Sequence, residues 1–500
     1  MGKINKLISV LFLLFFLIMA GAACSQQGKE NNKIRLTLLH FNDIYEITPV
    51  GGGKDGGLAR LAAYRKSLLK KNPNTITLLA GDLFSPSAMG TIKVNGERLA
   101  GKQMVDVLNH LGVDYVTFGN HEFDIKKEAF YARLAQSRFS WISSNVYDEK
   151  GESYPGVLKN KVFKIDDKKS GKSLKVGLFG VTLTKNQTDY VSFTDPFKAA
   201  AEQVKLLRDK VDILVALTHL SVEDDITLAE TLPGIDLILG GHEHENFQRM
   251  RGSDFTPIFK ADANVRSVYV INLEYDSNSG RLIIDPSFKP INDKMPEDAA
   301  VAKVVKGWVD KAFAAIRETG LNPDEVVAIT DIPLDGREAS VRNQPTKLTD
   351  LITVAMMKAF PRAELALLNG GSIRIDDVIP PGKITTYDII RVLPFGGYVK
   401  LVSIKGSLLS KVLSQGEANK GSGGYLQIAG ISQNGEGGWL INGNPLEKQL
   451  TYKLAINDFL LSGKEQGLSF LSLDNPAITL IEEGEQYELR KVVINYMKKW

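Results

Sequence analysis

Six histidines occur in the 500-residue sequence, and four of them lie with acidic and amide residues in short polar runs that follow predicted strands. These runs are Asn42-Asp43, Gly81-Asp82, Gly119-Asn120-His121-Glu122-Phe123-Asp124, Thr218-His219 and Gly240-Gly241-His242-Glu243-His244. Ligand sites in an open α/β sheet lie beyond the carboxyl ends of its strands. Five such ends carrying a carboxylate, an amide or an imidazole predict one metal site. The other two histidines, His40 and His110, lie in a strand and a helical pattern and are predicted to be structural.

The kinds of side chain in these runs indicate a catalytic metal centre. Carboxylates, an amide and imidazoles without thiolates suit Zn²⁺, Mn²⁺, Fe or Co better than a structural zinc. Two ions bridged by one carboxylate can bind a phosphoryl group and lower the pKa of a shared water. We therefore expect two divalent metal ions, with zinc, manganese, cobalt and iron all open.

The elements that must position these runs alternate along the first 285 residues. Strand-like runs of β-branched and apolar residues cover Ile34–Phe41, Thr75–Ala80, Tyr115–Phe118, Leu174–Val181, Asp212–Leu217 and Asp236–Leu239. Between them, Gly57–Lys71 and Gln103–Leu111 have apolar residues at three- and four-residue steps, which predicts helices. The alternation predicts a layered α/β domain over residues 34–295.

A different pattern follows Pro296. Residues 297–319 place their apolar side chains on one face, after an acidic start that suits the helix dipole, so they predict one long helix ending at Gly320. We interpret residues 296–320 as a connector helix. Residues 321–500 are rich in turns and glycines and predict a second domain of the α+β class.

The N-terminus has the pattern of an export signal. Lys3 and Lys6 precede an apolar run from Leu7 to Ala20, three small residues and Cys24, the only cysteine in the chain. Residues 1–23 therefore predict a signal peptide. The lone Cys24 resembles the lipidated cysteine of a bacterial lipoprotein, although a plain secretory signal with an incidental cysteine is the alternative. With a polar tether over residues 24–33, we expect an exported protein that is lipid-anchored to a bacterial membrane, on the periplasmic or cell-surface side.

Composition narrows the class of partner. The chain is 43% hydrophobic and 24% charged, with a formal net charge of +3. A nearly balanced charge gives no indication of a nucleic-acid partner. We expect a small-molecule ligand and no nucleic acid, and the sequence leaves the oligomeric state open.

The strand-end motifs resemble those of the calcineurin-like metallophosphoesterases, and specifically the secreted 5′-nucleotidase family. The resemblance covers nearly the whole mature chain, including the run Gly56-Gly57-Leu58-Ala59-Arg60. It implies an α/β/β/α metallophosphoesterase domain, the connector helix and a 5′-nucleotidase-like C-terminal domain that binds substrate.

The resemblance also implies roles for the polar residues. Asp82 would bridge both metal ions. One site would be completed by Asn120, His219 and His242, and the other by Asp43 and His244. His121, oriented by Asp124, would stabilise the transition state or the leaving group together with Asn120. The alternative for Asp124 is a helix N-cap.

One residue departs from the family pattern. The family has a histidine two residues after the first aspartate, where this chain has Tyr45. A neutral phenol, with a pKa near 10, is a poor ligand for Zn²⁺. Three interpretations follow: water or Glu46 replaces the missing ligand, Tyr45 points elsewhere, or Tyr45 binds a ferric ion as phenolate. The first two together are preferred from the sequence.

The resemblance gives the second domain a nucleotide site. Asn369 and Arg374, in the run Asn369-Gly370-Gly371-Ser372-Ile373-Arg374, and Arg342 match substrate-binding residues. Phe395 matches one of two aromatic rings that enclose the base. Guanidinium groups bind phosphate through paired hydrogen bonds, and aromatic faces stack on bases.

The second ring of that enclosure is absent from its expected position. The family motif Gly-Gly-Asp-Gly-(Phe/Tyr) corresponds here to Gly463-Lys464-Glu465-Gln466-Gly467-Leu468. Phe470 is two positions away from Leu468. The usual Glu and Gly-Asn near Arg342 are also replaced, by Pro345 and by Thr349-Asp350.

The resemblance as a whole implies a metal-dependent phosphohydrolase that acts on nucleotides or related phosphate esters outside the cytoplasm. One alternative keeps the chemistry and changes the substrate to a cyclic nucleotide or a UDP-sugar. The other is a non-catalytic surface lipoprotein that binds phosphate esters, which Tyr45 and Leu468 would favour.

Overall fold

The computed structural model describes residues 33–167, 171–435 and 437–499. The predicted signal peptide, Cys24 and the predicted tether up to Asn32 lie outside these residues, and Lys33, predicted as the end of the tether, begins strand β1. The chain divides into two compact units. Unit 1 comprises the chain up to Ile47, Gly56–Leu83 and Val105–Ala302, and unit 2 comprises Thr48–Asp55, Phe84–Met104 and Lys303–Trp500. The division is therefore not contiguous along the chain, because two segments from the first 110 residues belong to unit 2.

The first sheet of unit 1 contains the strands that precede three of the polar runs. Its order is β16-β15-β1-β2-β5-β6. The strands are β1 (Lys33–Phe41), β2 (Thr75–Ala80), β5 (Tyr115–Thr117), β6 (Ser140–Trp141), β15 (Ser267–Asp276) and β16 (Arg281–Pro290). β1, β2, β5 and β6 are parallel, so their carboxyl ends meet at one edge, while β15 and β16 are antiparallel to their neighbours.

The second sheet of unit 1 contains the strands that precede the other two polar runs. Its order is β13-β14-β12-β11-β9-β8. The strands are β8 (Asn160–Asp167), β9 (Lys172–Thr182), β11 (Ile213–His219), β12 (Leu237–Gly240), β13 (Phe247–Arg251) and β14 (Thr256–Lys260). β9, β11, β12 and β14 are parallel, and only the edge strands β8 and β13 run the other way.

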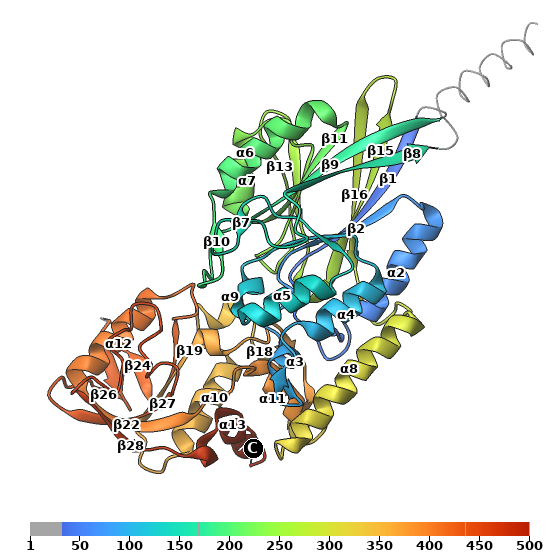
Figure 1. The fold of residues 1–500 in the computed structure, drawn as a ribbon. Coiled ribbons are helices and arrows are strands. Elements are labelled where there is room, and N and C mark those ends of the chain that lie inside the picture. Colours follow the sequence, from blue (N-terminus) through green and yellow to red (C-terminus); the bar gives the residue numbers. More distant parts are fainter. Residues whose placement is uncertain (1–32, 168–170, 436, 500) are drawn as a thin grey trace, which may run out of the picture. The chain divides into compact units, whose positions relative to one another are not determined.

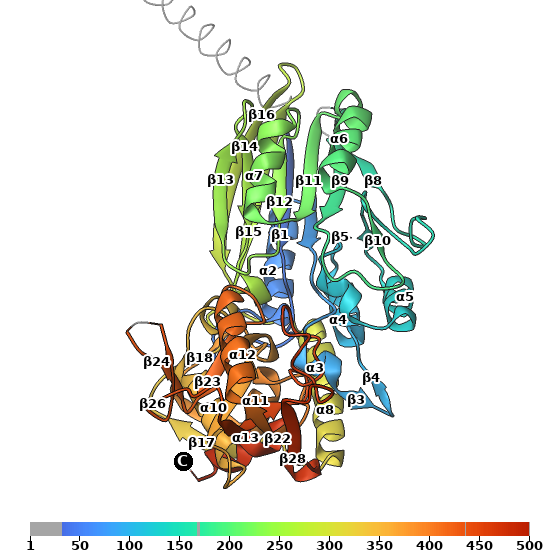
Figure 2. The same ribbon diagram turned by 90° about the vertical axis from the view of Figure 1, so that its left-hand side faces the viewer.

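Helices cover the outer faces of the two sheets, as Figures 1 and 2 show. The helices of unit 1 include α2 (Leu58–Lys71), α5 (Lys127–Gln136), α6 (Pro196–Leu207) and α7 (Val222–Thr231), and α4 (Lys102–Leu111) crosses into it. Apolar side chains of β1, β2, β9, β11, β12 and β15 form a shared core between the sheets. A second core lies between the second sheet and helices α6 and α7. These four layers confirm the predicted α/β/β/α arrangement.

Local sequence signals explain where several helices begin. The Asp195 carboxylate accepts a hydrogen bond from Lys198 N, and Pro196 occupies the first position of α6. Ser221 caps α7 in the same way through Asp224 N. The long helix predicted after Pro296 is α8 (Ala299–Glu318). The carboxylate of Asp298 caps it by accepting a hydrogen bond from Val301 N.

Unit 2 is a mixed α+β domain built on a five-stranded sheet. The sheet order is β23-β19-β27-β22-β28. Its strands are β19 (Leu365–Asn369), β22 (Val399–Lys405), β23 (Leu426–Ala429), β27 (Thr451–Asn457) and β28 (Ile478–Glu482). Most of α8, from Lys303 onward, belongs to this unit. The other helices include α3 (Ala88–Thr91), α9 (Glu338–Val341), α10 (Lys347–Lys358), α11 (Thr386–Val392), α12 (Gly406–Ala418) and α13 (Leu489–Met497). Two apolar cores, one containing residues of α10 and α13 and the other residues of α12, pack against the sheet.

Four pairings of short strands complete the fold. In unit 2, β3 (Lys93–Val94) pairs with β4 (Glu97–Arg98), β17 (Val326–Thr330) pairs with β21 (Gly382–Thr385), and β18 (Leu334–Asp335) pairs with β20 (Val378–Ile379). In unit 1, β7 (Val146–Tyr147) pairs with β10 (Ser192–Phe193). A small three-stranded sheet is formed by β24 (Ile431–Gln433), β25 (Trp439–Ile441) and β26 (Asn444–Pro445).

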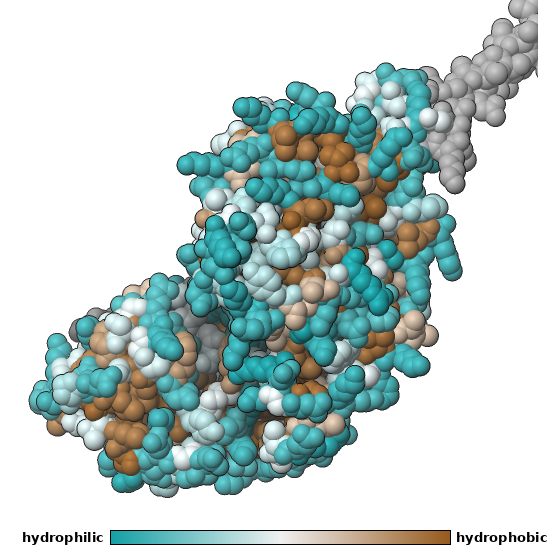
Figure 3. Space-filling model, viewed as in Figure 1, coloured by the Kyte–Doolittle hydropathy of each residue, from teal (hydrophilic) through white to brown (hydrophobic). Residues whose placement is uncertain are grey.

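The face shown in Figure 3 is covered mainly by hydrophilic side chains, with apolar side chains in small groups between them. Among the residues that the structure describes, no helix combines the length and apolar character needed to cross a membrane.

Candidate functional site

Two buried carboxylates form the centre of the candidate site. Asp43 follows β1 and Asp82 follows β2, and both side chains are fully buried. Asp43 N donates to Gly81 O and Ile44 N donates to Asp82 O, so the two turns are joined by backbone hydrogen bonds. Both aspartates have a positive φ, 52° and 57°, which turns their side chains out of the strand direction. The parallel pairing of β1 and β2 therefore brings the two carboxylates together.

Each carboxylate has one oxygen held by N–H donors and one oxygen that faces the centre. Asp43 Oδ2 accepts hydrogen bonds from Asn42 Nδ2 and His242 N. Asp82 Oδ1 accepts one from His121 N. This leaves Asp43 Oδ1 and Asp82 Oδ2 as the oxygens that point toward the other candidate ligands.

Two glycines allow the backbone to approach these carboxylates closely. A Cβ on Gly119 would lie 2.0 Å from Asp82 Oδ1, and a Cβ on Gly241 would lie 2.4 Å from Ala80 O and 3.0 Å from Asp43 Oδ2. Neither position can hold a side chain without moving the site. The glycines in the predicted polar runs are therefore part of the site.

His244 and Tyr45 lie against the same two oxygens. One ligand atom from each of Asp43, Asp82 and His244 lies within 4.8 Å of the others. The Tyr45 hydroxyl lies 3.3 Å from Asp43 Oδ1, 3.1 Å from Asp82 Oδ2 and 2.8 Å from His244 Nε2. The interpretation in which Tyr45 points elsewhere is therefore wrong. Glu46 is not a member of the three-residue group.

His219 has the geometry of a neutral metal ligand. It is fully buried at the end of β11, and its Nδ1 lies 2.7 Å from Ala80 O, to which it donates. In the neutral ring, the form that binds a metal, the lone pair would therefore be on Nε2, which lies 3.3 Å from Asp82 Oδ2. Among the residues that the structure describes, Nε2 has no hydrogen-bond partner. Asn120 Oδ1 is likewise buried without a partner. The ring of His242 lies edge-on to that of His219, with 5.4 Å between centroids.

These orphaned acceptors fit a bound cation. Asp82 Oδ2 faces both Tyr45 and His219, so the same oxygen borders both predicted ligand sets. A buried acceptor without a donor costs free energy unless something satisfies it. Asp43, Asp82 and His244 would hold one ion. The resemblance implies that Asp82, Asn120, His219 and His242 would hold a second.

The pKa values show that the site attracts positive charge. Burial alone would lower the pKa of His219, but the carboxylates of Asp82 and Asp43 raise it to about 10. Burial and the nearby His219 lower the pKa of His242 to about 2. The carboxylates thus favour one cation beside them strongly enough to overcome the desolvation of a buried imidazole.

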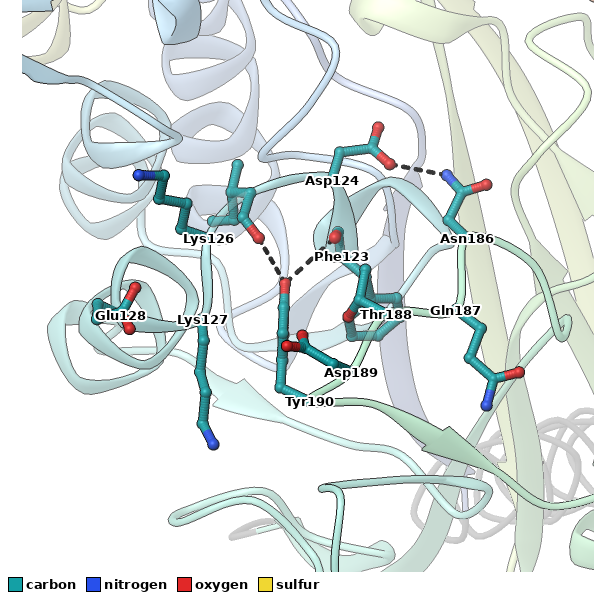
Figure 4. Close-up of a pocket in the computed structure, with 11 residues that line it drawn as sticks. Phe123, Asp124, Lys126, Lys127, Glu128, Asn186, Gln187, Thr188, Asp189 and Tyr190 are labelled. Atoms are coloured by element: carbon teal, nitrogen blue, oxygen red, sulfur yellow. Dashed lines mark hydrogen bonds between the residues drawn. The ribbon is translucent and has the colours of Figure 1, made fainter. Parts of the chain in front are cut away.

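His121 forms a dyad with Asp124 in the short helix η1 (His121–Asp124). His121 Nδ1 lies 2.6 Å from Asp124 Oδ2, and Asn186 Nδ2 donates to Asp124 Oδ1 at 2.9 Å. Figure 4 shows the Asn186 side chain turned toward Asp124. Because Nδ1–H donates to the carboxylate, Nε2 of His121 carries the ring's free lone pair or, in the protonated ring, its transferable proton. Asp124 does not cap α5, whose N-cap residue is Lys126.

An open hollow of about 640 Å³ adjoins this dyad. It is lined by the segments Phe123–Glu128 and Asn186–Tyr190, shown in Figure 4. The Tyr190 hydroxyl lies 2.6 Å from Ile125 O and 3.2 Å from Phe123 O, which fixes the turn after η1. Asn186 was not predicted, because it lies in a loop 62 residues from Asp124 and belongs to no motif.

Glu122 is a second residue that the sequence analysis did not assign. Its buried carboxylate accepts hydrogen bonds from the backbone N–H groups of Asp82, Leu83 and Gly119. Burial and the neighbouring Asp82 raise the pKa of Glu122 to about 7. Glu122 therefore joins the turn after β2 to the turn after β5. In the sequence, the only indication of this role is that Glu122 lies in the same polar run as His121.

A buried lysine supports the loop that carries His242 and His244. Lys260, the last residue of β14, is fully buried, and its Nζ donates to Leu220 O at 2.6 Å and to Gly241 O at 2.8 Å. It also lies 3.0 Å from Asp225 Oδ2 and 2.5 Å from Glu243 Oε2. Burial works to lower the pKa of Lys260, but the two carboxylates raise it overall.

The other two histidines, His40 and His110, lie outside the candidate metal site. His40, in β1, is fully buried, with Nε2 3.1 Å from Gly240 O, and burial lowers its pKa to about 3. His110, in α4, is partly exposed, and its Nδ1 lies 2.8 Å from Asp106 O. Neither takes part in the group around Asp82.

In unit 2, two of the predicted substrate residues meet at one carboxylate. Arg342 Nη2 lies 2.5 Å and Arg374 Nη1 2.9 Å from Glu338 Oε1. The third, Asn369, donates to Glu465 Oε2, and its Oδ1 accepts from Ser372 Oγ and Asn457 Nδ2. Both arginines are thus held in place by a carboxylate.

The aromatic positions of unit 2 differ sharply in exposure. Phe395 is 53% exposed, as a stacking ring must be, while Leu468 is fully buried in an apolar core. Phe470 packs partly against the same core, with Lys411 Nζ 3.9 Å from its ring centroid. Phe459 is also exposed, at 44%. Asp458, which precedes Phe459 in the sequence, donates a backbone hydrogen bond to Tyr398 O, in the loop that follows Phe395.

The chain is similar to known phosphoesterases over most of its length. Residues 36–246 match the family described as calcineurin-like phosphoesterase, and residues 326–472 match the 5′-nucleotidase C-terminal domain. The "Trifunctional nucleotide phosphoesterase protein YfkN" of Bacillus subtilis is 28% identical over 490 residues, covering 86% of this chain. This chain spans only 32% of that protein's length.

In two further comparisons, the similarity covers almost the whole of both proteins. The 5′-nucleotidase of Vibrio cholerae is 25% identical over 515 residues, which is 91% of this chain and 90% of that protein. The solved structure of a 5′-nucleotidase precursor from Thermus thermophilus superposes with a TM-score of 0.73 at 23% identity. The superposition covers 93% of this chain and 96% of the solved chain. With both domain matches in the family's order, the chain belongs to the 5′-nucleotidase family of calcineurin-like metallophosphoesterases, which are hydrolases of phosphate esters.

Proposed function

We propose that the chain removes phosphate from nucleotides outside the cytoplasm by means of two divalent metal ions. The observation that carries this proposal is the convergence of Asp43, Asp82, His219 and His244 at one edge of unit 1, with unpartnered acceptors facing the centre. The identity of the relatives supports nucleotides as the substrate class. Export rests on the signal-like residues 1–23 and the lipid anchor on Cys24.

The side chains around the centre would each have a defined task. When bound, two divalent ions supply Lewis acidity toward the phosphoryl oxygens and lower the pKa of the attacking water. The Asn120 amide lies at the same edge and would donate a hydrogen bond to a phosphoryl oxygen as charge develops. His121 Nε2 would donate a proton to the leaving oxygen, while Asp124 and Asn186 keep the ring oriented.

The His121 role predicts an effect that depends on the leaving group. His121→Asn is expected to reduce kcat by about 10²–10⁴-fold for a nucleoside monophosphate, whose alkoxide leaves poorly without a proton. For p-nitrophenyl phosphate, whose phenolate leaves unaided, the loss is expected to be much smaller. Steady-state kinetics on both substrates measures the difference.

His110→Asn, at the partly exposed histidine of α4, is the matched control and is expected to leave both rates unchanged. Equal losses of kcat on the two substrates would remove His121 from the proton-transfer role.

The nucleotide site predicts a base-dependent effect at Phe395. Stacking on an aromatic ring contributes about 1–3 kcal/mol per base, so Phe395→Ala is expected to raise KM for a nucleotide by about 5–150-fold. A phosphate ester without a base should show no change. Phe255→Ala, at a more exposed phenylalanine of unit 1, is the control. An unchanged KM for every nucleotide would exclude Phe395 as a stacking ring.

A substrate panel tests the proposed function as a whole. Metal-free protein would be loaded in turn with Zn²⁺, Mn²⁺, Co²⁺ and Fe²⁺ and assayed on nucleoside monophosphates, 2′,3′-cyclic nucleotides and UDP-sugars. Phosphate release from the monophosphates at the highest kcat/KM is the expected result. A preference for the cyclic or UDP-linked substrates would instead identify a phosphodiesterase or pyrophosphatase on the same scaffold.

A further inference from the structure

We infer that the Tyr45 hydroxyl oxygen is a fourth protein ligand of the ion that Asp43, Asp82 and His244 would hold, and that this position takes a hard trivalent ion such as Fe³⁺. The inference rests on the proposed metal centre, but it places a trivalent ion where the proposed function has a divalent one, beside Asp43, Asp82 and His244. It makes Tyr45 a metal ligand, whereas the preferred interpretation of the sequence gave Tyr45 no part in metal binding.

The spacing of the four atoms is that of ligands around one ion. Oxygen and nitrogen ligands lie about 2.0–2.2 Å from a metal, so neighbouring ligands of one ion lie about 3.0–3.5 Å apart. The Tyr45 oxygen is 3.3 Å, 3.1 Å and 2.8 Å from the ligand atoms of Asp43, Asp82 and His244. His244 Nε2 is 3.6 Å from Asp43 Oδ1. All four atoms can therefore contact one central cation with small adjustments.

With both carboxylates ionised, hydrogen bonds do not satisfy all three of these contacts of the Tyr45 hydroxyl. The Tyr45 hydroxyl has one proton and is close to two carboxylate oxygens and one imidazole nitrogen. If His244 Nε2–H donates to the tyrosine oxygen, the hydroxyl proton can reach only one carboxylate, and the third contact has no proton. A cation between the four atoms converts every contact into a favourable one.

Tyr45 is also fixed in this position. Its side chain is 5% exposed, and its backbone N–H donates to Asn264 Oδ1 at 2.9 Å. Asn264 N in turn donates to Asp43 O at 2.7 Å. The Tyr45 and His244 rings lie with 5.2 Å between centroids. The segment that carries Asp43 thus delivers Tyr45 to the same centre through a rigid, buried turn.

The donor set matches a trivalent ion by charge and hardness. Two carboxylates and a phenolate oxygen provide three negative charges around one position, and oxygen donors of this kind favour hard cations. On coordination the O–H bond breaks, an oxygen–metal bond forms and the proton leaves to solvent, with no change of oxidation state. A divalent ion gains less from a phenol oxygen, because it competes less effectively with that proton.

Spectroscopy of the ferric protein tests the inference directly. Metal-free full-length protein would be titrated with ferric citrate, and the visible spectrum and the iron content after desalting recorded. A tyrosinate–Fe³⁺ pair gives a charge-transfer band, so we expect a coloured protein with about one iron per chain. Tyr45→Phe is expected to lose the band completely and to bind Fe³⁺ at least about tenfold more weakly.

Two further variants define the outcome. Tyr154→Phe, at a fully buried tyrosine whose hydroxyl donates to Tyr190 O, should keep the band. Tyr45→His should lose the band and bind Zn²⁺ more tightly than the wild type. A band that persists in Tyr45→Phe, or a colourless wild-type protein that binds divalent ions and turns over, would overturn the inference while leaving the proposed function intact. Wild-type protein that binds none of these metals would instead overturn the proposed metal centre.

Discussion

Asp82→Asn is expected to reduce phosphate release by at least about 10³-fold, because the shared ligand of both ions is lost. Metal contributions to phosphoryl transfer amount to several kcal/mol, and each 1.36 kcal/mol corresponds to a tenfold change in rate. The asparagine keeps an oxygen that can accept from His121 N, so the turn after β2 should survive. The substitution also removes the pairing of Asp82 with His219 in the metal-free protein, so the metal-free variant is expected to be less stable than the wild type.

Thermal unfolding with and without metal separates these two effects. Bound metal stabilises the wild type by an amount that rises with the logarithm of its affinity, and the variant should lose most of that increase in Tm. Asp285→Asn, which neutralises an exposed aspartate in β16, is the control and should keep both activity and the metal-induced shift. Activity within tenfold of wild type in Asp82→Asn would show that Asp82 does not bridge the ions.

Lys260→Met is expected to destabilise unit 1 by about 3–5 kcal/mol. The substitution leaves Asp225 and Glu243 without their shared cation in a region where Asp225 is fully buried. Breaking a buried ion pair on one side is costly because the remaining charge is not compensated. For a unit of this size the loss corresponds to a decrease in Tm of about 6–20 °C. Since Lys260 also bonds Gly241 O, metal affinity should fall with stability.

A triple variant tests whether uncompensated charge is the cause. Adding Asp225→Asn and Glu243→Gln to Lys260→Met removes all three charges and should recover most of the lost Tm, which calorimetry of the metal-free protein would measure. Metal affinity should recover less, because the hydrogen bond to Gly241 O is still missing. If the triple variant were no more stable than Lys260→Met, the loss would come from packing around the lysine stem.

Several features of the metal centre could be predicted from the sequence because they depend on local patterns. The strand runs that end at Phe41 and Ala80 correspond to β1 and β2 without change at those ends. Parallel strands share an edge, so the residues that follow them must gather, whatever the details of packing. The run predicted to end at Phe118 ends one residue earlier, at Thr117, which leaves the turn before His121 slightly longer.

Other features required the folded chain. Tyr45 was placed outside the centre in the preferred interpretation, yet the positive φ of Asp43 turns the following residues back toward β2, and the hydroxyl lies between the ligands. Lys260 and Asn186 reach the site from other strands and loops, and no spacing in the sequence connects them to it. The sequence pattern also predicted a continuous first domain, whereas Thr48–Asp55 and Phe84–Met104 belong to unit 2 in the folded chain.

The sequence by itself determined which residue types stand at the strand ends, because strand periodicity and the glycines in three of the five polar runs are local properties. It likewise determined that Leu468 offers no aromatic ring. Only the tertiary structure decided which way each side chain points and which atoms meet. Those outcomes depend on backbone torsions at single turns and on contacts between residues about 40 to 220 positions apart, such as Tyr45 with Asp82 and with Asn264. The tyrosine that looked like a lost ligand has, in the folded chain, its hydroxyl oxygen 2.8 Å from His244 Nε2, closer than Asp43 Oδ1 at 3.6 Å.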